Sequence, residues 1–201
     1  MRIAPSPADA SPDRRRDIVE AAVGLFNRYG YKRTSVDSIA REAGVAKATF
    51  YAYFPGKDDV FRAVCVAVCD RILEQAAAAA ERAPDLESRL RGVLEAKLVT
   101  VYELVDASPH AREILDSQTR IGADIVESAD REYVRRLGAL LADADRAREL
   151  DLKAAGHTPS SAAQLLVRSA HGAAHDTTST RALQKQLRDL VRLFLRALEP
   201  R

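Results

Sequence analysis

The sequence predicts an all-α protein with about nine helices. Alanine and leucine are abundant among its 201 residues, whereas the helix-breaking residues are few, with nine glycines and eight prolines. Long stretches carry apolar residues with a period near 3.6, the repeat of a helix with one buried face. Alternation of the kind that marks strands is absent over any useful length. These three observations together favour a helical architecture throughout.

The composition narrows the class of protein further. Hydrophobic residues make up 47% and charged residues 30%, an ordinary balance for a globular protein. A membrane-spanning helix needs a run of about 18 apolar residues, and the sequence contains none. Residues 1–12 lack the apolar core of a secretory signal, so we expect a disordered tail. Cys65 and Cys69 are expected on one helix, as small buried hydrophobes rather than a redox pair, and a cytoplasmic location follows.

The charge divides the chain into two parts. Residues 1–57 hold ten Lys/Arg and six Asp/Glu, a net charge of +4. The other 144 residues hold 21 and 23 respectively, a net charge of −2. A small basic head on a slightly acidic body suits a protein whose head faces nucleic acid. We therefore expect a head at 13–57 and a body at 58–201.

The head is predicted to contain three helices. The first begins near Asp13, which is able to cap it, and ends at Gly30, where a left-handed residue is usually needed. The second follows Ser35, a plausible N-cap, and is broken by Gly44. The third occupies about 46–53. Two short helices with a glycine turn between them are typical of a helix-turn-helix.

The body is predicted to contain the remaining helices. One begins at Lys57 and continues to about Arg82. Breaks at Pro, Gly and polar clusters then delimit the others, which are expected at about 86–106, 110–117, 119–154, 159–175 and 181–198. The range 119–154 is long enough to contain an interruption.

The third helix has two distinct faces. If Phe50 and Phe54 face inward, a turn of 100° per residue puts Ala48 and Ala52 on the opposite face. A solvent-facing helix normally carries Glu, Lys or Gln there, whereas alanine lets a helix approach another surface closely. In the DNA major groove alanine also contacts the thymine methyl group. This pattern predicts a recognition helix.

Polar side chains border that outer face. Lys47 is predicted to reach a guanine edge or a phosphate, and Thr49, Tyr51 and Tyr53 to donate hydrogen bonds to phosphates. Core packing is the alternative for the two tyrosines. At helix starts, backbone N–H groups favour a phosphate; the residues there are Thr34, Ser35 and Lys57.

A more specific signal lies in the residues themselves. The head contains the pattern Arg16-x-Ile18-x-x-Ala21-Ala22-x-x-Leu25-Phe26-x-x-x-Gly30-Tyr31-x-x-Thr34-Ser35-Val36-x-x-Ile39-Ala40-x-x-Ala43-Gly44-Val45-x-Lys47-x-Thr49-Phe50-Tyr51-x-Tyr53-Phe54-x-x-Lys57. Over roughly residues 14–64 the chain closely resembles the N-terminal domain of TetR-family repressors. The resemblance implies an all-α homodimer whose last two helices form a four-helix bundle with those of its partner. It also implies a ligand cavity in the C-terminal domain and release of a double-stranded DNA operator when a small-molecule effector binds. DNA contacts in the family fall on positions that are here Thr34, Ser35, Lys47, Thr49, Tyr51, Tyr53 and Lys57.

Beyond about residue 65 the interpretation rests on patterns alone. The helices at 159–175 and 181–198 carry wide apolar stripes, which favours packing against both their own core and a second subunit. Ordinary core packing is the alternative. As effector-lining residues we single out Tyr102, His171 and His175. Core packing explains Tyr102 equally well, and for the two histidines an interface contact or a satisfied, semi-buried side chain is the alternative. The two histidines lie four residues apart, but no third metal ligand accompanies them, so no metal is expected.

No motif of an enzyme or a cofactor site was found, and neither activity nor cofactor is expected. The leading hypothesis is a sequence-specific transcriptional regulator, a repressor released from a palindromic operator by a ligand. A rival hypothesis is a helical ligand-binding or scaffolding protein whose head no longer reads DNA. An activator in place of a repressor is also left open.

Overall fold

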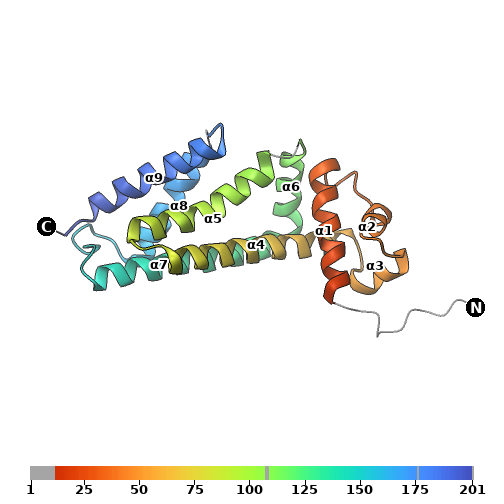
Figure 1. Cartoon of the computed structure of the whole chain (residues 1–201), viewed down its shortest axis with the longest axis horizontal. Coiled ribbons are helices and arrows are strands. Elements are labelled where there is room, and N and C mark those ends of the chain that lie inside the picture. The colour runs from red at the N-terminus through yellow and green to blue at the C-terminus, as the bar shows by residue number, and fades with distance from the viewer. Residues whose placement is uncertain (1–11, 107–108, 176, 201) are drawn as a thin grey trace, which may run out of the picture. The chain divides into compact units, whose positions relative to one another are not determined.

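The computed structural model describes residues 12–106, 109–175 and 177–200, so nearly all of the predicted tail at 1–12 lies outside the described residues. Within these ranges the chain forms nine helices and no strand (Figure 1). The helices are α1 (Pro12–Tyr29), α2 (Val36–Glu42), α3 (Lys47–Tyr53), α4 (Lys57–Arg82), α5 (Leu86–Asp106), α6 (Ala111–Ile121), α7 (Ala123–Arg146), α8 (Pro159–His175) and α9 (Thr180–Ala197). The all-α class is thus confirmed. None of the described helices is long and apolar enough to cross a membrane.

The predicted break between 117 and 119 is wrong. Helix α6 continues to Ile121, and the chain bends at Gly122 before α7 begins. The Gly122 carbonyl accepts hydrogen bonds from the amides of Ile125 and Val126, both at 3.1 Å. The first turn of α7 is therefore anchored on Gly122, which separates the two helices.

Helix α7 also ends earlier than the sequence indicated, at Arg146 rather than near 154. Arg148 adopts a positive φ of 60°, which lies outside the right-handed helical region, so the helix does not extend through this residue. The chain turns back, and the Asp145 carboxylate accepts a hydrogen bond from the Leu152 amide at 2.9 Å. Leu150 and Leu152 are buried in this turn. Burial of two leucines and the satisfied amide explain why the helical pattern stops.

The contacts divide the chain into two compact units. Among the described residues, the first consists of 12–68 with 104–106 and 109–126, and the second of 69–103 with 127–175 and 177–200. Helix α6 therefore packs with the N-terminal helices, although it lies far from them in sequence. The functional boundary expected after Lys57 stays a prediction.

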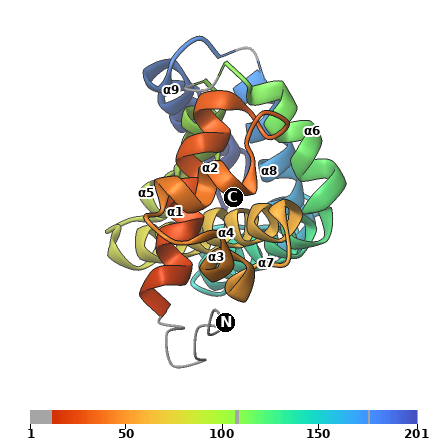
Figure 2. The ribbon, with the colours of Figure 1, turned by 90° about the vertical axis from the view of Figure 1, so that its right-hand side faces the viewer.

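The first unit has an aromatic centre. The ring centroids of Phe26 and Tyr31 lie 5.3 Å and 5.1 Å from that of Phe61 on α4. Ile114 and Ile121 of α6 pack partly buried against the same core. Helices α2 and α3 lie together on one side of α1 (Figures 1 and 2). Residues of α2 and α3 are buried in the same core.

The second unit is built from the helices of the predicted body. The buried Tyr133 hydroxyl donates a hydrogen bond to the Val93 carbonyl at 2.8 Å, which joins α7 to α5. Gly92 allows α5 to approach the alanine run of α4, because an added Cβ would lie only 2.8 Å from the Cβ of Ala79. Helices α8 and α9 pack side by side. The fully buried residues of these two helices include Ala163, Leu166, Ala170, Leu183, Leu187 and Val191.

The two cysteines are free thiols. Cys65 is buried in the core of the first unit, as a small hydrophobe is expected to be. Cys69 is half-buried, and burial raises the pKa of its thiol. A raised pKa lowers the fraction of reactive thiolate, in keeping with a packing role.

Candidate nucleic-acid interface

The turn between α2 and α3 is fixed by its backbone. Gly44 adopts a φ of +65°, a conformation that favours glycine. The Val45 amide donates to the Ala40 carbonyl at 2.9 Å, and the Gly44 amide donates to the Arg41 carbonyl at 3.2 Å. At the other end of α2, Ser35 is the N-cap of a capping box with Ser38. The sequence therefore specifies both ends of α2 locally, and α3 leaves the turn in a defined direction.

Helix α3 has the two faces that the sequence predicts. Phe50 is fully buried and Phe54 is 3% exposed. Ala48 and Ala52 are exposed on the opposite face, and Tyr51 is 49% exposed beside them. An exposed strip of small side chains, bordered by polar ones, is suited to close approach to another surface. The predicted inner and outer faces are confirmed.

Tyr53 differs from Tyr51 in its packing. Its side chain is half-buried and packs against the core of the first unit. The alternative weighed for this residue, core packing, is thus partly correct. Thr49 is also half-buried. These two residues border the outer face with only part of their surface available.

Lys47 is held by an acidic partner that the sequence analysis missed. Its Nζ lies 2.8 Å from Oδ1 of Asp37 in the first turn of α2, and both side chains are more than half exposed. The hydrogen bond that the ammonium donates to this carboxylate raises the pKa of Lys47. The lysine is thus a fixed positive charge at the start of α3. Because the two residues are ten apart and on different helices, only the turn geometry brings them together.

Thr34 is the one predicted contact residue whose side chain is buried, at 3% exposure. Its hydroxyl donates to the Gly30 carbonyl at 2.7 Å and also lies 3.4 Å from that of Leu25. A phosphate contact by this hydroxyl is therefore incompatible with the structure, because the group holds the end of α1. The Thr34 backbone remains as the predicted contact. Ser35 next to it is exposed, although its side chain caps α2.

Lys57 folds back onto the turn after α1. Its Nζ donates to the Tyr31 carbonyl at 2.9 Å and lies 4.2 Å from the centroid of the Tyr31 ring. The Tyr31 hydroxyl in turn donates to Asp58. Burial, followed by this carboxylate, raises the pKa of Tyr31 to about 12. The bond to the Tyr31 carbonyl uses one of the three donors of the Lys57 ammonium.

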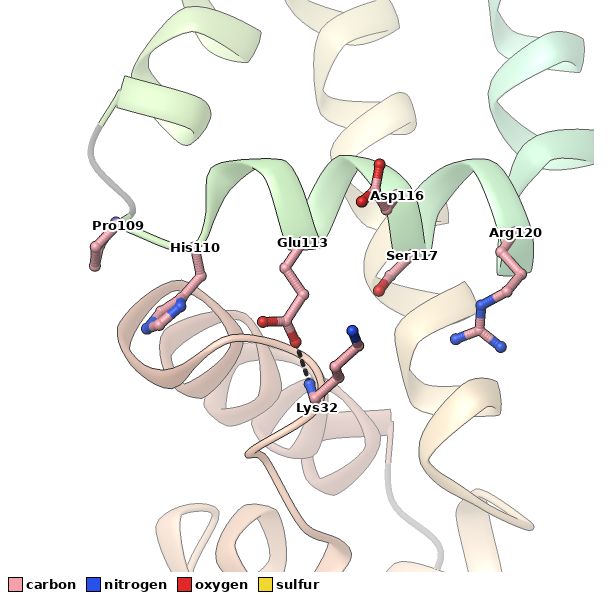
Figure 3. Close-up of a pocket in the computed structure, with 7 residues that line it drawn as sticks. All are labelled: Lys32, Pro109, His110, Glu113, Asp116, Ser117 and Arg120. Carbon is pink, nitrogen blue, oxygen red and sulfur yellow. Dashed lines mark hydrogen bonds between the residues drawn. The ribbon is translucent and has the colours of Figure 1, made fainter.

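An open pocket of about 480 Å³ lies between the turn after α1 and helix α6 (Figure 3). At its centre the Glu113 carboxylate points from α6 to the turn and accepts a hydrogen bond from the Lys32 amide. Charges of both signs line the pocket, which is formed by Lys32, Pro109, His110, Glu113, Asp116, Ser117 and Arg120. No local sequence signal marks Glu113, which lies 81 residues from its partner.

The predicted effector residues stay a prediction. A second open pocket, of about 740 Å³, lies along α7 and the start of α8. Neither it nor the pocket of Figure 3 is lined by Tyr102, His171 or His175. Tyr102 is half-buried on α5, and the two histidines are exposed on α8. Desolvation by neighbouring groups, followed by the charge of Lys97, lowers the pKa of His171 although the residue keeps an exposed surface. A cluster of three or more metal-binding side chains is absent from the described residues.

The fold and this outer face define a helix-turn-helix domain of the DNA-binding class. Residues 18–64 match the family described as bacterial regulatory proteins of the tetR family. The match assigns residues 18–64 to the type of N-terminal domain found in that family.

Curated relatives match mainly the same part of the chain. An uncharacterised HTH-type transcriptional regulator of Bacillus subtilis, YhgD, is 35% identical over 71 residues, which are 35% of this chain and 37% of that protein. The HTH-type transcriptional repressor KstR2 of Rhodococcus jostii is 29% identical over 119 residues, or 58% of this chain and 56% of that protein. The chain thus matches less than two thirds of the length of either relative.

Solved structures match nearly the whole chain. The flavonoid-responsive regulator FrrA is 28% identical, with a TM-score of 0.64 over 95% of this chain and all of that one. A transcriptional regulator from Cytophaga hutchinsonii has a TM-score of 0.75 over 91% of this chain and 97% of that one. At 20% identity, the second likeness shows the fold alone. The helical body is therefore of the same architecture as in these regulators.

Proposed function

We propose that the protein is a sequence-specific transcriptional repressor that binds a palindromic operator as a homodimer and leaves it when a small molecule binds to the body. The observation that carries the proposal is the outer face of α3. Ala48 and Ala52 are exposed there over a buried Phe50. Exposed alanines between a cation and a phenol suit a helix that enters the major groove.

The proposed contacts to the operator are of two kinds, to base edges and to phosphates. Lys47 at the start of α3 is the proposed base contact, since guanine presents two acceptors in the major groove. Tyr51, Thr49 and the exposed part of Tyr53 are proposed to donate to phosphates and so to fix the register. Three further phosphate contacts are proposed at helix starts. They are made by the backbone of Thr34, by Ser35, and by Lys57 through donors that its bond to the Tyr31 carbonyl does not use.

The homodimer is proposed to form through α8 and α9. Leu193 on α9 is 67% exposed and Leu165 on α8 is 45% exposed. Leu190 and Phe194 beside Leu193 are half-buried. Large apolar side chains left in water on two adjacent helices favour coverage by a second copy. Two copies would present two recognition helices to successive major grooves, about 34–36 Å apart.

Release by an effector requires a difference in affinity between two states. A small molecule shifts the protein off DNA only if it binds the DNA-incompetent state more tightly. Helix α4 runs unbroken from Lys57, beside the recognition helix, to Arg82 in the second unit. We propose that α4 carries the conformational change between the DNA-competent and the DNA-incompetent state. FrrA is described as flavonoid-responsive and KstR2 as a repressor, and these descriptions support the proposal by analogy.

Selection of genomic fragments by the full-length protein tests this function. We expect enrichment of an inverted repeat whose half-site centres are about one helical turn apart, close to genes that the protein regulates. Recovery of fragments with no shared sequence would overturn the proposal. Lysate fractions or compounds that release the protein from an enriched fragment would then identify the effector.

A further inference from the structure

A carboxylate lies at the surface that is proposed to meet DNA. Asp37 is more than half exposed, and its Oδ1 lies 2.8 Å from the Lys47 ammonium. A negative charge beside the phosphate backbone opposes binding. Exposed ion pairs also contribute little to folding stability. The carboxylate favours the start of α2, where it lies in the first turn, but neither general affinity nor stability accounts for its short contact with Lys47.

The pair is also the tightest of the head. In the described residues up to Phe54, the other three ion pairs have N–O distances of 3.5, 3.7 and 3.9 Å. One of these, between Arg28 and Glu42, involves the same helix α2 at its other end. The short contact joins α2 to α3 across the turn, so it restricts a lysine that would otherwise be flexible.

We propose that Asp37 is a specificity-determining residue that positions Lys47 for a base edge and keeps it from settling on phosphates. This inference rests on the proposed DNA-binding function. A lysine ammonium has three donors, so one bond to Asp37 leaves two for acceptors in the groove. On DNA without the right base, Lys47 has only phosphate to meet, and there the nearby carboxylate repels the phosphate. Asp37 thus weakens binding to DNA that lacks the matching base more than it weakens binding to DNA that carries it.

The test compares two duplexes. One is recovered by selection from randomised DNA with the full-length protein, and the other is its scrambled version. Dissociation constants are measured for the wild type and for Asp37→Asn at several salt concentrations. We expect Asp37→Asn to bind the scrambled duplex about two- to fivefold more tightly, the scale of one exposed charge interaction. The selected duplex should gain less, so that the selectivity ratio falls. An unchanged or larger ratio would overturn the proposal.

The same substitution in a Lys47→Gln background shows whether Asp37 acts through Lys47. There we expect Asp37→Asn to leave the selectivity ratio unchanged. A fall as large as in the wild type would mean that Asp37 acts independently, contrary to the proposal. Glu42→Gln is the matched control, because it removes one exposed carboxylate from the same helix. An equal fall in the selectivity ratio for Glu42→Gln would mean that net charge alone causes the effect, contrary to the proposal.

Two further results separate this inference from the function on which it rests. If selection recovers no preferred duplex, the proposed function fails. If a preferred duplex is recovered and its ratio is insensitive to Asp37, only the role of Asp37 fails. Circular dichroism confirms folding of each variant, and Asp37→Ser serves as a second variant with a side chain suited to the first turn of a helix.

Discussion

The Glu113 carboxylate on α6 accepts a hydrogen bond from the backbone amide of Lys32, in the turn that precedes the helix-turn-helix. Gly30 provides the space for this contact. A Cβ added at Gly30 would lie 2.7 Å from Oε2 of Glu113 and 3.1 Å from Cγ of His110. Helix α6 is thereby attached to the end of α1, which explains why both belong to one compact unit.

Gly30→Ala should therefore be more destabilising than a glycine replacement that affects φ alone. Gly30 has a φ of +81°, so alanine is strained there, and the added methyl would displace the Glu113 carboxylate. Gly44, with a φ of +65° and no atom within 4 Å of an added Cβ, is the matched control. We expect a loss of about 1 kcal/mol for Gly44→Ala and about 0.5–1.5 kcal/mol more for Gly30→Ala, the worth of one hydrogen bond. Urea unfolding measures both, and equal losses would contradict the role assigned to Glu113.

Phe50 and Tyr51 should separate folding from DNA binding. Phe50→Ala removes a fully buried ring and should cost about 3–5 kcal/mol of unfolding free energy. Tyr51→Ala removes a ring that is 49% exposed, so it should leave the helical circular dichroism and the melting temperature nearly unchanged. It should weaken binding to the selected duplex. A collapsed fold in Tyr51→Ala would show instead that Tyr51 belongs to the core.

Thr34 and Ser35 are neighbours with different expected roles. Thr34→Val removes the buried hydroxyl that donates to the Gly30 carbonyl, and should cost about 1–3 kcal/mol because that acceptor stays buried. DNA affinity of the folded variant should be unchanged. Ser35→Ala removes the N-cap of α2, at about 0.5–2 kcal/mol, and should also weaken DNA binding. If Thr34→Val weakened binding as much as Ser35→Ala, the burial of Thr34 would not describe the DNA-bound state.

Leu193 tests the proposed dimer. Leu193→Asp places a charge on the exposed apolar part of α9, so we expect a monomer in light scattering coupled to size-exclusion chromatography. The matched control is Val66→Asp on α4, another exposed apolar residue that is not part of α8 or α9. A dimer that persists in Leu193→Asp, or a monomer in both variants, would contradict an interface through α8 and α9.

Local patterns predicted most of the head. Ser35 and Gly44 mark both ends of α2 because capping and a positive φ depend on the residue itself. The inward position of Phe50 follows from helical periodicity. The end of α7 at Arg146 was missed, because it depends on burial of Leu150 and Leu152 and on a hydrogen bond from a side chain, which periodicity does not register.

The candidate site was predicted in outline but not in its partners. The sequence identified the outer face of α3, and its polar border, from spacing alone. It did not reveal that Lys47 is paired with Asp37, that Lys57 lies on Tyr31 or that the Thr34 hydroxyl is used internally. Each of these contacts depends on how two elements meet. For the same reason no local pattern in the sequence identifies Glu113.

The central claim, that this head reads a DNA sequence through α3, is tested most directly by the affinity ratio between the selected and the scrambled duplex at moderate salt. Specific binding by regulators of this kind exceeds non-specific binding by about a thousandfold or more. The wild type should show such a ratio, and Lys47→Ala combined with Tyr51→Ala should lose most of it without loss of helical signal. A wild-type ratio near one, in a folded dimer, would contradict the account.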